Sequence, residues 1–353
     1  MDEMNGLERV ATALQFKEAD RVPVAPLVCG ATHRVAGITY GEWSSGNDVD
    51  AMVRGHLDAL KLLGHDGIVA LVDLSVEAAD FGQEVFFPEM STAYPNYNNP
   101  FIKSIGDYKK IQRINPRKTK RMKSVIDMIS GIAKEVGKTH AILGFVYGSL
   151  GVMSMMRGAE NFFMDLIENP DEVLPALQAM DDTLLEYAMA QVEAGAHCVC
   201  YDHLYCSQSI LSKELWEKFE GPSLKRLCDA IRDKGALVAL HNCGNGIYFD
   251  MSMKWANPHV ISHAYLSDDV SSWEEQKAKW GSKVPTCGWI PPGPVAMLGT
   301  PEEIDEECKA EIDVYAKGGG FILSTGCEFP PNAPLLNAKR IVEASKKYGV
   351  YKK

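Results

Sequence analysis

The stretch that indicates the fold is residues 198–243, which read CVCYDHLYCSQSILSKELWEKFEGPSLKRLCDAIRDKGALVALHNC. It begins with a short apolar run, 198–203, continues through a segment of helical periodicity, 212–234, and ends with a second apolar run, 237–243. Both runs are continuously apolar rather than alternating, which is typical of a strand buried on both faces of a parallel sheet. The stretch therefore predicts a strand, helix, strand unit.

The same order recurs along the whole chain. Eight apolar runs are predicted to be strands: residues 22–29, 67–73, 141–147, 198–203, 237–243, 260–266, 284–290 and 320–327. Helices are predicted at residues 48–63, 120–136, 170–194, 212–234, 271–280, 301–317 and 336–348, with start signals at Asn169-Pro170, Ser212 and Thr300-Pro301. Strand followed by helix, repeated about eight times without a break in composition, predicts a single (β/α)8 barrel domain over residues 1–353. A doubly wound sheet is the structural alternative.

Residues 80–117 do not follow this alternation. They are rich in Pro, Tyr and Asn, as in the run PNYNNP at 95–100. We expect them to form an insertion after the second strand, either a lid or an interface arm.

Composition and charge exclude several classes of function. The chain has 353 residues, 46% hydrophobic and 24% charged, which is typical of a folded domain. Lys and Arg total 36 against 47 Asp and Glu, a net charge of −11, so neither nucleic acid nor an anionic membrane is an expected partner. No apolar run approaches 18 residues and residues 1–6 do not resemble a signal peptide, so we expect a cytoplasmic protein. Nine cysteines are too few for a disulfide scaffold and odd in number, which raises the question of a metal.

A candidate metal site lies at the ends of two predicted strands. His241 and Cys243 are two residues apart in the run 237–243, so their side chains point to the same side. Cys327 ends the last run, 320–327, and a barrel brings the carboxyl ends of its strands to one rim. One imidazole and two thiolates leave a tetrahedral position open, as in catalytic zinc sites. The alternative is that each is an ordinary buried side chain.

Two motifs carry a family resemblance. His241-Asn-Cys243-Gly and the later run TGCEFPPNAP at 325–334 resemble the zinc methyltransferases of the uroporphyrinogen decarboxylase superfamily. That group includes the methylcobalamin:coenzyme M methyltransferases and the methyltransferase components of O-demethylases. The opening, RVATALQFKEADRVPV at 9–24, is similar to the start of the superfamily, and residues 151–170 are similar to its central helix region.

The resemblance implies a site and an activity. His241, Cys243 and Cys327 are the implied zinc ligands, and the implied activity is methyl transfer between a corrinoid (methylcobalamin) and a small substrate. The substrate is either a thiol, whose thiolate zinc favours, or a methyl ether, expected to be aromatic, whose oxygen zinc polarises. Cobalamin-binding domains typically carry Asp-x-His-x-x-Gly, which this chain lacks, so the corrinoid is expected on a separate protein.

Other residues are second-tier candidates. Asp202 is a candidate to orient substrate or a zinc ligand, with an ordinary hydrogen bond at the strand end as the alternative. Tyr147 is a candidate to line the pocket, with core packing as the alternative, and Glu77 is a candidate to reach the metal as a fourth ligand. Met153 and Met156 are candidates for contact with the corrin face, with packing in a helix core as the alternative.

Glu220 precedes His241 by 21 residues, and some ether-cleaving relatives are thought to use carboxylates as zinc ligands. Its place in the predicted helix 212–234 favours a solvated or salt-bridged role instead.

Two other functions stay open at this point. A uroporphyrinogen decarboxylase needs clustered arginines to bind the many carboxylates of its substrate. Residues 26–37 contain a single arginine, Arg34. A non-catalytic barrel with structural zinc is the other alternative. The sequence leaves the direction of transfer and any homo-oligomer undecided.

Overall fold

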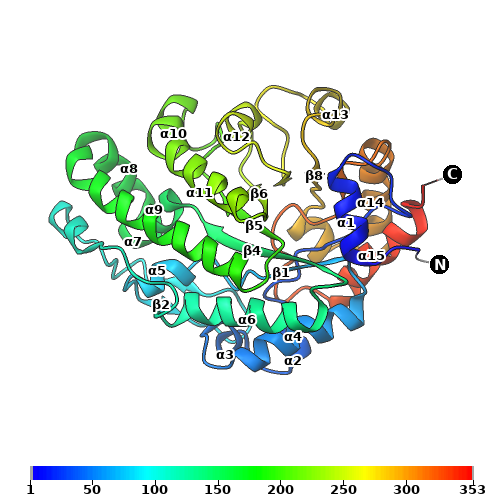
Figure 1. The fold of residues 1–353 in the computed structure, drawn as a ribbon, viewed down its shortest axis with the longest axis horizontal. Helices are drawn as coiled ribbons and strands as arrows, with labels where there is room; N and C mark the ends of the chain where they lie inside the picture. The colour runs from blue at the N-terminus through cyan, green and yellow to red at the C-terminus, as the bar shows by residue number, and fades with distance from the viewer. Residues whose placement is uncertain (1–2, 352–353) are drawn as a thin grey trace.

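The computed structural model describes residues 3–351 and shows a parallel β-barrel surrounded by helices (Figure 1). The main sheet has seven strands, and every neighbouring pair is parallel, in the order β1-β4-β5-β6-β7-β8-β9. These strands are β1 (Gly67–Val69), β4 (Ala141–Tyr147), β5 (Cys198–Asp202), β6 (Leu237–Asn242), β7 (Val260–His263), β8 (Thr286–Cys287) and β9 (Phe321–Ile322). The strand order follows the chain without reversing, which confirms the barrel and excludes the doubly wound alternative.

The first predicted strand, residues 22–29, closes the barrel without forming a regular ladder. Val24 makes an isolated parallel bridge with Leu323, just after β9. On its other side, the Asp66 N–H donates to the Val24 carbonyl at 2.8 Å, just before β1. The segment contains two prolines, which have no N–H to donate, so a continuous ladder cannot form. An irregular segment therefore takes the eighth place.

Seven of the helices correspond to segments with predicted helical periodicity. They are α4 (Val49–Leu63), α6 (Arg121–Val136), α9 (Pro170–Glu193), α10 (Lys213–Phe219), α11 (Gly221–Asp233), α13 (Trp273–Trp280) and α14 (Pro301–Tyr315), and α15 (Leu335–Tyr348) adds the predicted closing helix. The segment 212–234 was predicted as one helix and is two, because Pro222 lies in the first turn of α11 and cannot continue α10.

Shorter helices complete the chain. They are α1 (Gly6–Leu14), α2 (Thr32–Ala36), α3 (Tyr40–Ser44), α5 (Val76–Asp80), α7 (Ser149–Arg157), α8 (Ala159–Glu168), α12 (Phe249–Trp255), the 3-10 helix η1 (Ile105–Lys110) and the π-helix η2 (Pro292–Met297). Helix α1 packs against β1, β4 and β9 and lies on the same side of the barrel as α15 (Figure 1). No helix within residues 3–351 combines the length and the apolar character needed to cross a membrane.

Residues 80–117 lie between α5 and α6 and stand outside the barrel sheet. They contain a small antiparallel pair, β2 (Val85–Phe86) with β3 (Tyr94–Pro95), followed by η1. Several of its large apolar side chains are exposed, among them Phe86 and Tyr97. A role as lid or interface arm remains a prediction.

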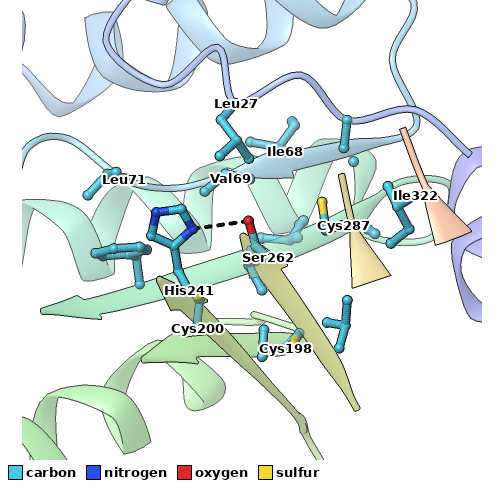
Figure 2. A pocket seen from close by; sticks show the side chains of 18 of the residues that line it. Leu27, Ile68, Val69, Leu71, Cys198, Cys200, His241, Ser262, Cys287 and Ile322 are labelled. Carbon is cyan, nitrogen blue, oxygen red and sulfur yellow. Dashed lines mark hydrogen bonds between the residues drawn. The ribbon is translucent and has the colours of Figure 1, made fainter. Parts of the chain in front are cut away.

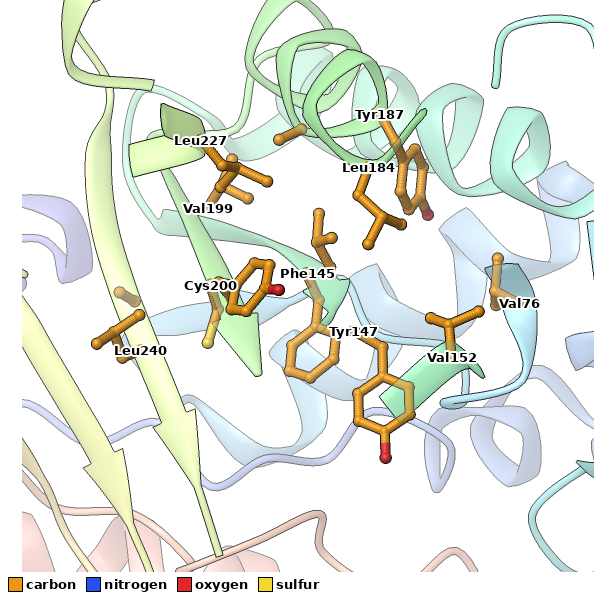
Figure 3. Close-up of a cluster of buried hydrophobic side chains, with 14 of the residues drawn as sticks. Val76, Phe145, Tyr147, Val152, Leu184, Tyr187, Val199, Cys200, Leu227 and Leu240 are labelled. Carbon is orange, nitrogen blue, oxygen red and sulfur yellow. The ribbon is translucent and has the colours of Figure 1, made fainter. Parts of the chain in front are cut away.

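The hydrophobic core between strands and helices holds the barrel wall in place (Figure 3). Val199 of β5 and Leu240 of β6 are buried, as are Leu184 of α9 and Leu227 of α11. Burial of apolar surface is worth roughly 25 cal/mol per Å², so these layers supply most of the stability that fixes the strand ends. The strand ends then carry the candidate site.

Candidate metal centre

Three side chains from distant parts of the sequence meet at the carboxyl ends of the strands. One ring nitrogen of His241 and the sulfurs of Cys243 and Cys327 all lie within 4.8 Å of one another. His241 is buried, whereas both cysteines are partly exposed. Within residues 3–351, no other group of three His, Cys, Asp or Glu side chains is clustered in this way.

The local sequence explains how the three are brought together. His241 lies in β6 and Cys243 follows the strand, so the two-residue period of extended chain directs both to the same side. Cys327 follows Gly326, whose N–H donates to the Ile290 carbonyl at 2.9 Å. A Cβ at Gly326 would lie 2.8 Å from the Ala264 Cα, so only glycine allows this close approach.

Hydrogen bonds couple the three donors. The Cys243 thiol donates to the Cys327 sulfur, and this bond, with a second from His241, lowers the pKa of Cys327 well below its usual value although burial opposes the change. Burial alone would lower the pKa of His241, but its bond to Cys327 and the charge of Asp202 raise it. The two sulfurs are thus coupled, because the same contact that lowers the pKa of Cys327 raises the pKa of Cys243.

This set of donors fits a zinc ion. Imidazole nitrogen and thiolate sulfur are its usual protein ligands, and three of them leave a fourth position for a substrate. The second ring nitrogen of His241, Nδ1, is held by Ser262 at 3.0 Å (Figure 2), so Nε2 is the nitrogen left for a metal.

Beneath these donors, a cavity of about 200 Å³ extends through the inside of the barrel. We call it the core cavity. The three donors line its end at the carboxyl ends of the strands, and Ile68, Cys198 and Ile322 also line it. Figure 2 shows His241 together with these three residues. A substrate bound at the donors would therefore face the core cavity.

Asp202, at the end of β5, lies where the sequence predicts it. It lines the core cavity, and within the described chain its Oδ1 has no hydrogen-bond partner although it is buried. Burial raises the pKa of this carboxyl to about 7. An unpaired buried oxygen is costly, which makes it a candidate for contact with substrate.

Glu77 is not part of the clustered donors. Its Oε1 accepts a hydrogen bond from the Tyr147 N–H at 3.0 Å, and burial raises its pKa to about 8. The neighbouring Asp73 forms a buried ion pair with Arg121. This part of the structure ties α5 to β4, and a role for Glu77 as a metal ligand remains a prediction.

Tyr147 is buried and lies outside the lining of the core cavity. It points to the same side of β4 as Phe145, which does line the cavity (Figure 3). A Cβ at Gly151 would lie 2.2 Å from the Tyr147 ring, so Gly151 leaves the room that this ring occupies. Tyr147 thus packs against α7, next to the cavity, and a role in lining the pocket stays a prediction.

Met153 and Met156 do not form an open apolar wall. Both side chains are completely buried in α7 within the main hydrophobic core. A buried side chain has no surface to offer a partner, so the expectation that they contact a corrin is at odds with the structure. The alternative reading, packing in a helix core, fits their burial.

The expectation of a solvated Glu220 is wrong. Its carboxylate is buried at the junction of α10 and α11, where it accepts hydrogen bonds from the Tyr201 hydroxyl at 3.0 Å and the Trp216 Nε1 at 2.6 Å. Burial raises its pKa to about 8. The helix breaks at this residue, which turns the side chain inward.

Two residues of the site were missed from the sequence. Ser262 pairs with His241 in the register of β6 and β7, so the two-residue period of the run 260–266 was the available signal. Glu328 follows Cys327, lines the core cavity and accepts a hydrogen bond from the Gly30 N–H at 2.9 Å. Glu328 directly follows Cys327 in the sequence, and this neighbouring position was the available signal.

Comparisons with known proteins agree with this architecture. The family model described as uroporphyrinogen decarboxylase (URO-D) matches residues 5–348. Methylcobamide:CoM methyltransferase MtbA of Methanosarcina mazei is 24% identical over 351 residues, a match that covers 99% of each chain. Uroporphyrinogen decarboxylase of Helicobacter pylori is 23% identical over 303 residues, which cover 81% of this chain and 82% of that protein.

A solved structure described as a methyltransferase from Methanosarcina mazei has the same fold. Its TM-score is 0.82 at 21% sequence identity, with 98% of this chain and 99% of that chain covered.

Proposed function

Because this chain belongs to the uroporphyrinogen decarboxylase family and carries a His, Cys, Cys cluster at the mouth of its barrel, we propose that it is a zinc-dependent methyltransferase. It moves a methyl group between a corrinoid held by a separate protein and a small substrate. The observation that carries the proposal is the convergence of His241, Cys243 and Cys327 within 4.8 Å.

These three side chains would hold the ion and leave one position free. When bound, zinc would supply Lewis acidity toward the sulfur of a thiol or the oxygen of a methyl ether. Cys243 and Cys327, as thiolates, would balance the charge of the ion, and Ser262 would fix the His241 ring. Asp202, whose Oδ1 has no partner within the described chain, would orient the substrate.

The transfer is balanced in either direction. With a thiol, the substrate would lose its S–H proton to water, its sulfur would donate an electron pair to the new S–CH3 bond, and the broken Co–C bond would leave its pair on cobalt, which would go from Co(III) to Co(I). With a methyl ether, Co(I) donates the pair to the new Co–CH3 bond, and the ether oxygen keeps the pair of the broken O–CH3 bond and takes a proton from water.

The two alternatives have less support. The decarboxylase relative matches 81% of the chain, whereas the methyltransferase relative matches 99%, and residues 26–37 contain one arginine where a polyanionic porphyrinogen needs several. A purely structural zinc site is usually closed by four protein ligands, whereas three residues are clustered here within residues 3–351.

Metal analysis and a spectral assay test the proposal. We expect about one zinc per chain, and a change in the corrin spectrum when methylcobalamin is mixed with the protein and a thiol, or Co(I) cobalamin with a methoxybenzene. A zinc-loaded protein that changes the spectrum with neither class of substrate would leave the binding barrel as the better assignment. Release of CO2 from uroporphyrinogen without metal would favour the decarboxylase.

A further inference from the structure

The inside of this barrel is unusually open. In (β/α)8 barrels, layers of bulky branched side chains normally fill the interior. Asp202 and His241 are register partners on β5 and β6. Two residues earlier on the same strands lies another register pair, Cys200 and Ala239, and both of these side chains are small. Both line the core cavity.

Small side chains continue around the wall. Ser262 on β7, Cys287 on β8 and Ala25 in the segment that closes the barrel also face the core cavity. At the amino ends of the strands, Leu7 and Leu14 of α1 line its floor. The core cavity is therefore a mostly apolar space inside the barrel, with the three metal-site donors at one end.

Its size matches a single aromatic ring. The core cavity measures about 200 Å³. An apolar cavity of roughly 150 Å³ in another protein stays dry and takes up benzene. A space of this kind, open to water, would gain free energy when an apolar group fills it.

The part of the wall that the structure describes has no lysine or arginine to attract an anion. Among residues 3–351, no Lys or Arg lines the core cavity, and the carboxyl groups of Asp202 and Glu328 do. An ionised carboxyl repels a sulfonate or a carboxylate, and a protonated one carries no charge to balance it. Burial of such an anion without a cationic partner costs several kcal/mol.

Two cations, at the first residues of α6 and α10, have acidic partners of their own. Arg121 pairs with Asp73, and Lys213 lies 2.8 Å from both Asp250 and Asp268. Freeing either one for a substrate would leave buried or partly buried carboxylates unpaired.

We propose that the substrate of this enzyme is an uncharged aromatic compound, a methoxybenzene or a benzenethiol, whose ring occupies the core cavity while its oxygen or sulfur lies at the His241, Cys243 and Cys327 donors. This inference rests on the proposed function and names its substrate class. It separates this chain from its MtbA relative, named for coenzyme M, because coenzyme M carries a sulfonate.

Direct binding to the zinc-loaded protein tests the inference independently of catalysis. The probes are methoxybenzene, benzenethiol, toluene and 2-mercaptoethanesulfonate, measured by titration calorimetry. Toluene has no donor atom for a metal, so its binding reports the core cavity alone. We expect the three ring compounds to bind, and methoxybenzene or benzenethiol to be the better methyl-transfer substrate than 2-mercaptoethanesulfonate.

Filling the cavity should remove this binding. Ala239→Leu places three more carbon atoms in the space, and we expect toluene and methoxybenzene binding to fall by about tenfold or more, with zinc content unchanged. Cys200→Leu, on the neighbouring strand, provides a second test should Ala239→Leu fail to fold. Ala310→Leu makes the same change at an exposed position of α14 and serves as the matched control.

The outcomes separate this inference from the proposed function. Methyl transfer to 2-mercaptoethanesulfonate without binding of any ring compound would overturn the inference and leave the proposed function standing. Ring binding that Ala239→Leu does not weaken would also overturn it, because the ring would lie elsewhere. Toluene binding that Ala239→Leu removes supports the cavity assignment, and absence of all methyl transfer would then count against the proposed function alone.

Discussion

Ser262 Oγ lies 3.0 Å from Nδ1 of His241, and the two residues are register partners on adjacent strands β7 and β6 (Figure 2). The bond fixes the rotation of the imidazole ring and commits Nδ1, so Nε2 is the nitrogen available to a metal. Histidine ligands of zinc usually make such a second bond, and it is built here from the sheet itself.

Ser262→Ala should weaken zinc binding without removing it. Loss of the bond to Nδ1 frees the His241 ring to rotate, and loss of such a partner typically costs about 10 to 100-fold in metal affinity. Competition with a chromophoric chelator measures the change. Ser252→Ala, which removes a buried hydroxyl in α12, is the control. Equal zinc affinity in Ser262→Ala and the wild type would show that the bond from Ser262 does not support metal binding by His241.

Cys243→Ala and Cys327→Ala should each abolish zinc binding and methyl transfer together. The fold should persist, because a barrel of this size has a core that does not depend on one site. Metal analysis, the corrin spectrum and circular dichroism give the three readouts. Cys228→Ala changes a buried thiol on α11 outside the site and should retain zinc.

A different result would redefine the site. If both cysteine variants kept a full complement of zinc, the ion would be bound elsewhere and the three clustered side chains would be ordinary neighbours. If only one of the two variants lost zinc, the ion would have two protein ligands in place of three, namely His241 and the cysteine whose replacement removed the zinc.

The sequence could predict those parts of the site that follow from the two-residue period of a strand and from the topology of a barrel. The shared direction of His241 and Cys243 follows from the two-residue period of a strand, and the meeting with Cys327 follows once a barrel is assumed. The break at Glu220 was hidden, because helical periodicity continues across it and only Pro222 marks it. The segment 22–29 was also misjudged as a regular strand, although its prolines were visible.

The core cavity lay beyond reach of the sequence for another reason. Cys200 and Ala239 are unremarkable in their own strands, and each could pack against a larger neighbour. Only the register that places them side by side, beneath Asp202 and His241, leaves the space unfilled. Two sequence motifs thus predict the donor atoms of the site, whereas the volume of the core cavity follows only from the register of the paired strands.

Glu220→Gln should flatten the dependence of stability on pH. Burial raises the pKa of Glu220 to about 8 in the folded protein, from 4.5 for a free carboxyl. Between these values the unfolded chain releases the proton that the folded protein keeps, so this carboxyl lowers the free energy of unfolding as pH rises from about 4.5 to 8.

Denaturant unfolding of both proteins at pH 5 and pH 8 measures the effect. The wild type should lose on the order of a few kcal/mol more than Glu220→Gln over this interval. Glu302→Gln, which removes an exposed carboxyl on α14, controls for the change in net charge. Equal losses in wild type and Glu220→Gln would mean that the buried carboxyl is ionised at pH 5.

Glu77→Gln should leave zinc affinity within about twofold of the wild type, because the Glu77 carboxyl is committed to the protein and not to the metal centre. Its Oε1 accepts the Tyr147 N–H at 3.0 Å, and an amide oxygen can accept the same bond. Burial raises the pKa of Glu77 to about 8, so the carboxyl that the glutamine amide replaces is mostly uncharged at neutral pH. Chelator competition at pH 7 measures the affinity, and thermal unfolding shows whether the bond to β4 survives. A tenfold or greater fall in zinc affinity at unchanged thermal stability would instead make Glu77 the fourth ligand, and the position that we assign to substrate would then be filled by the protein.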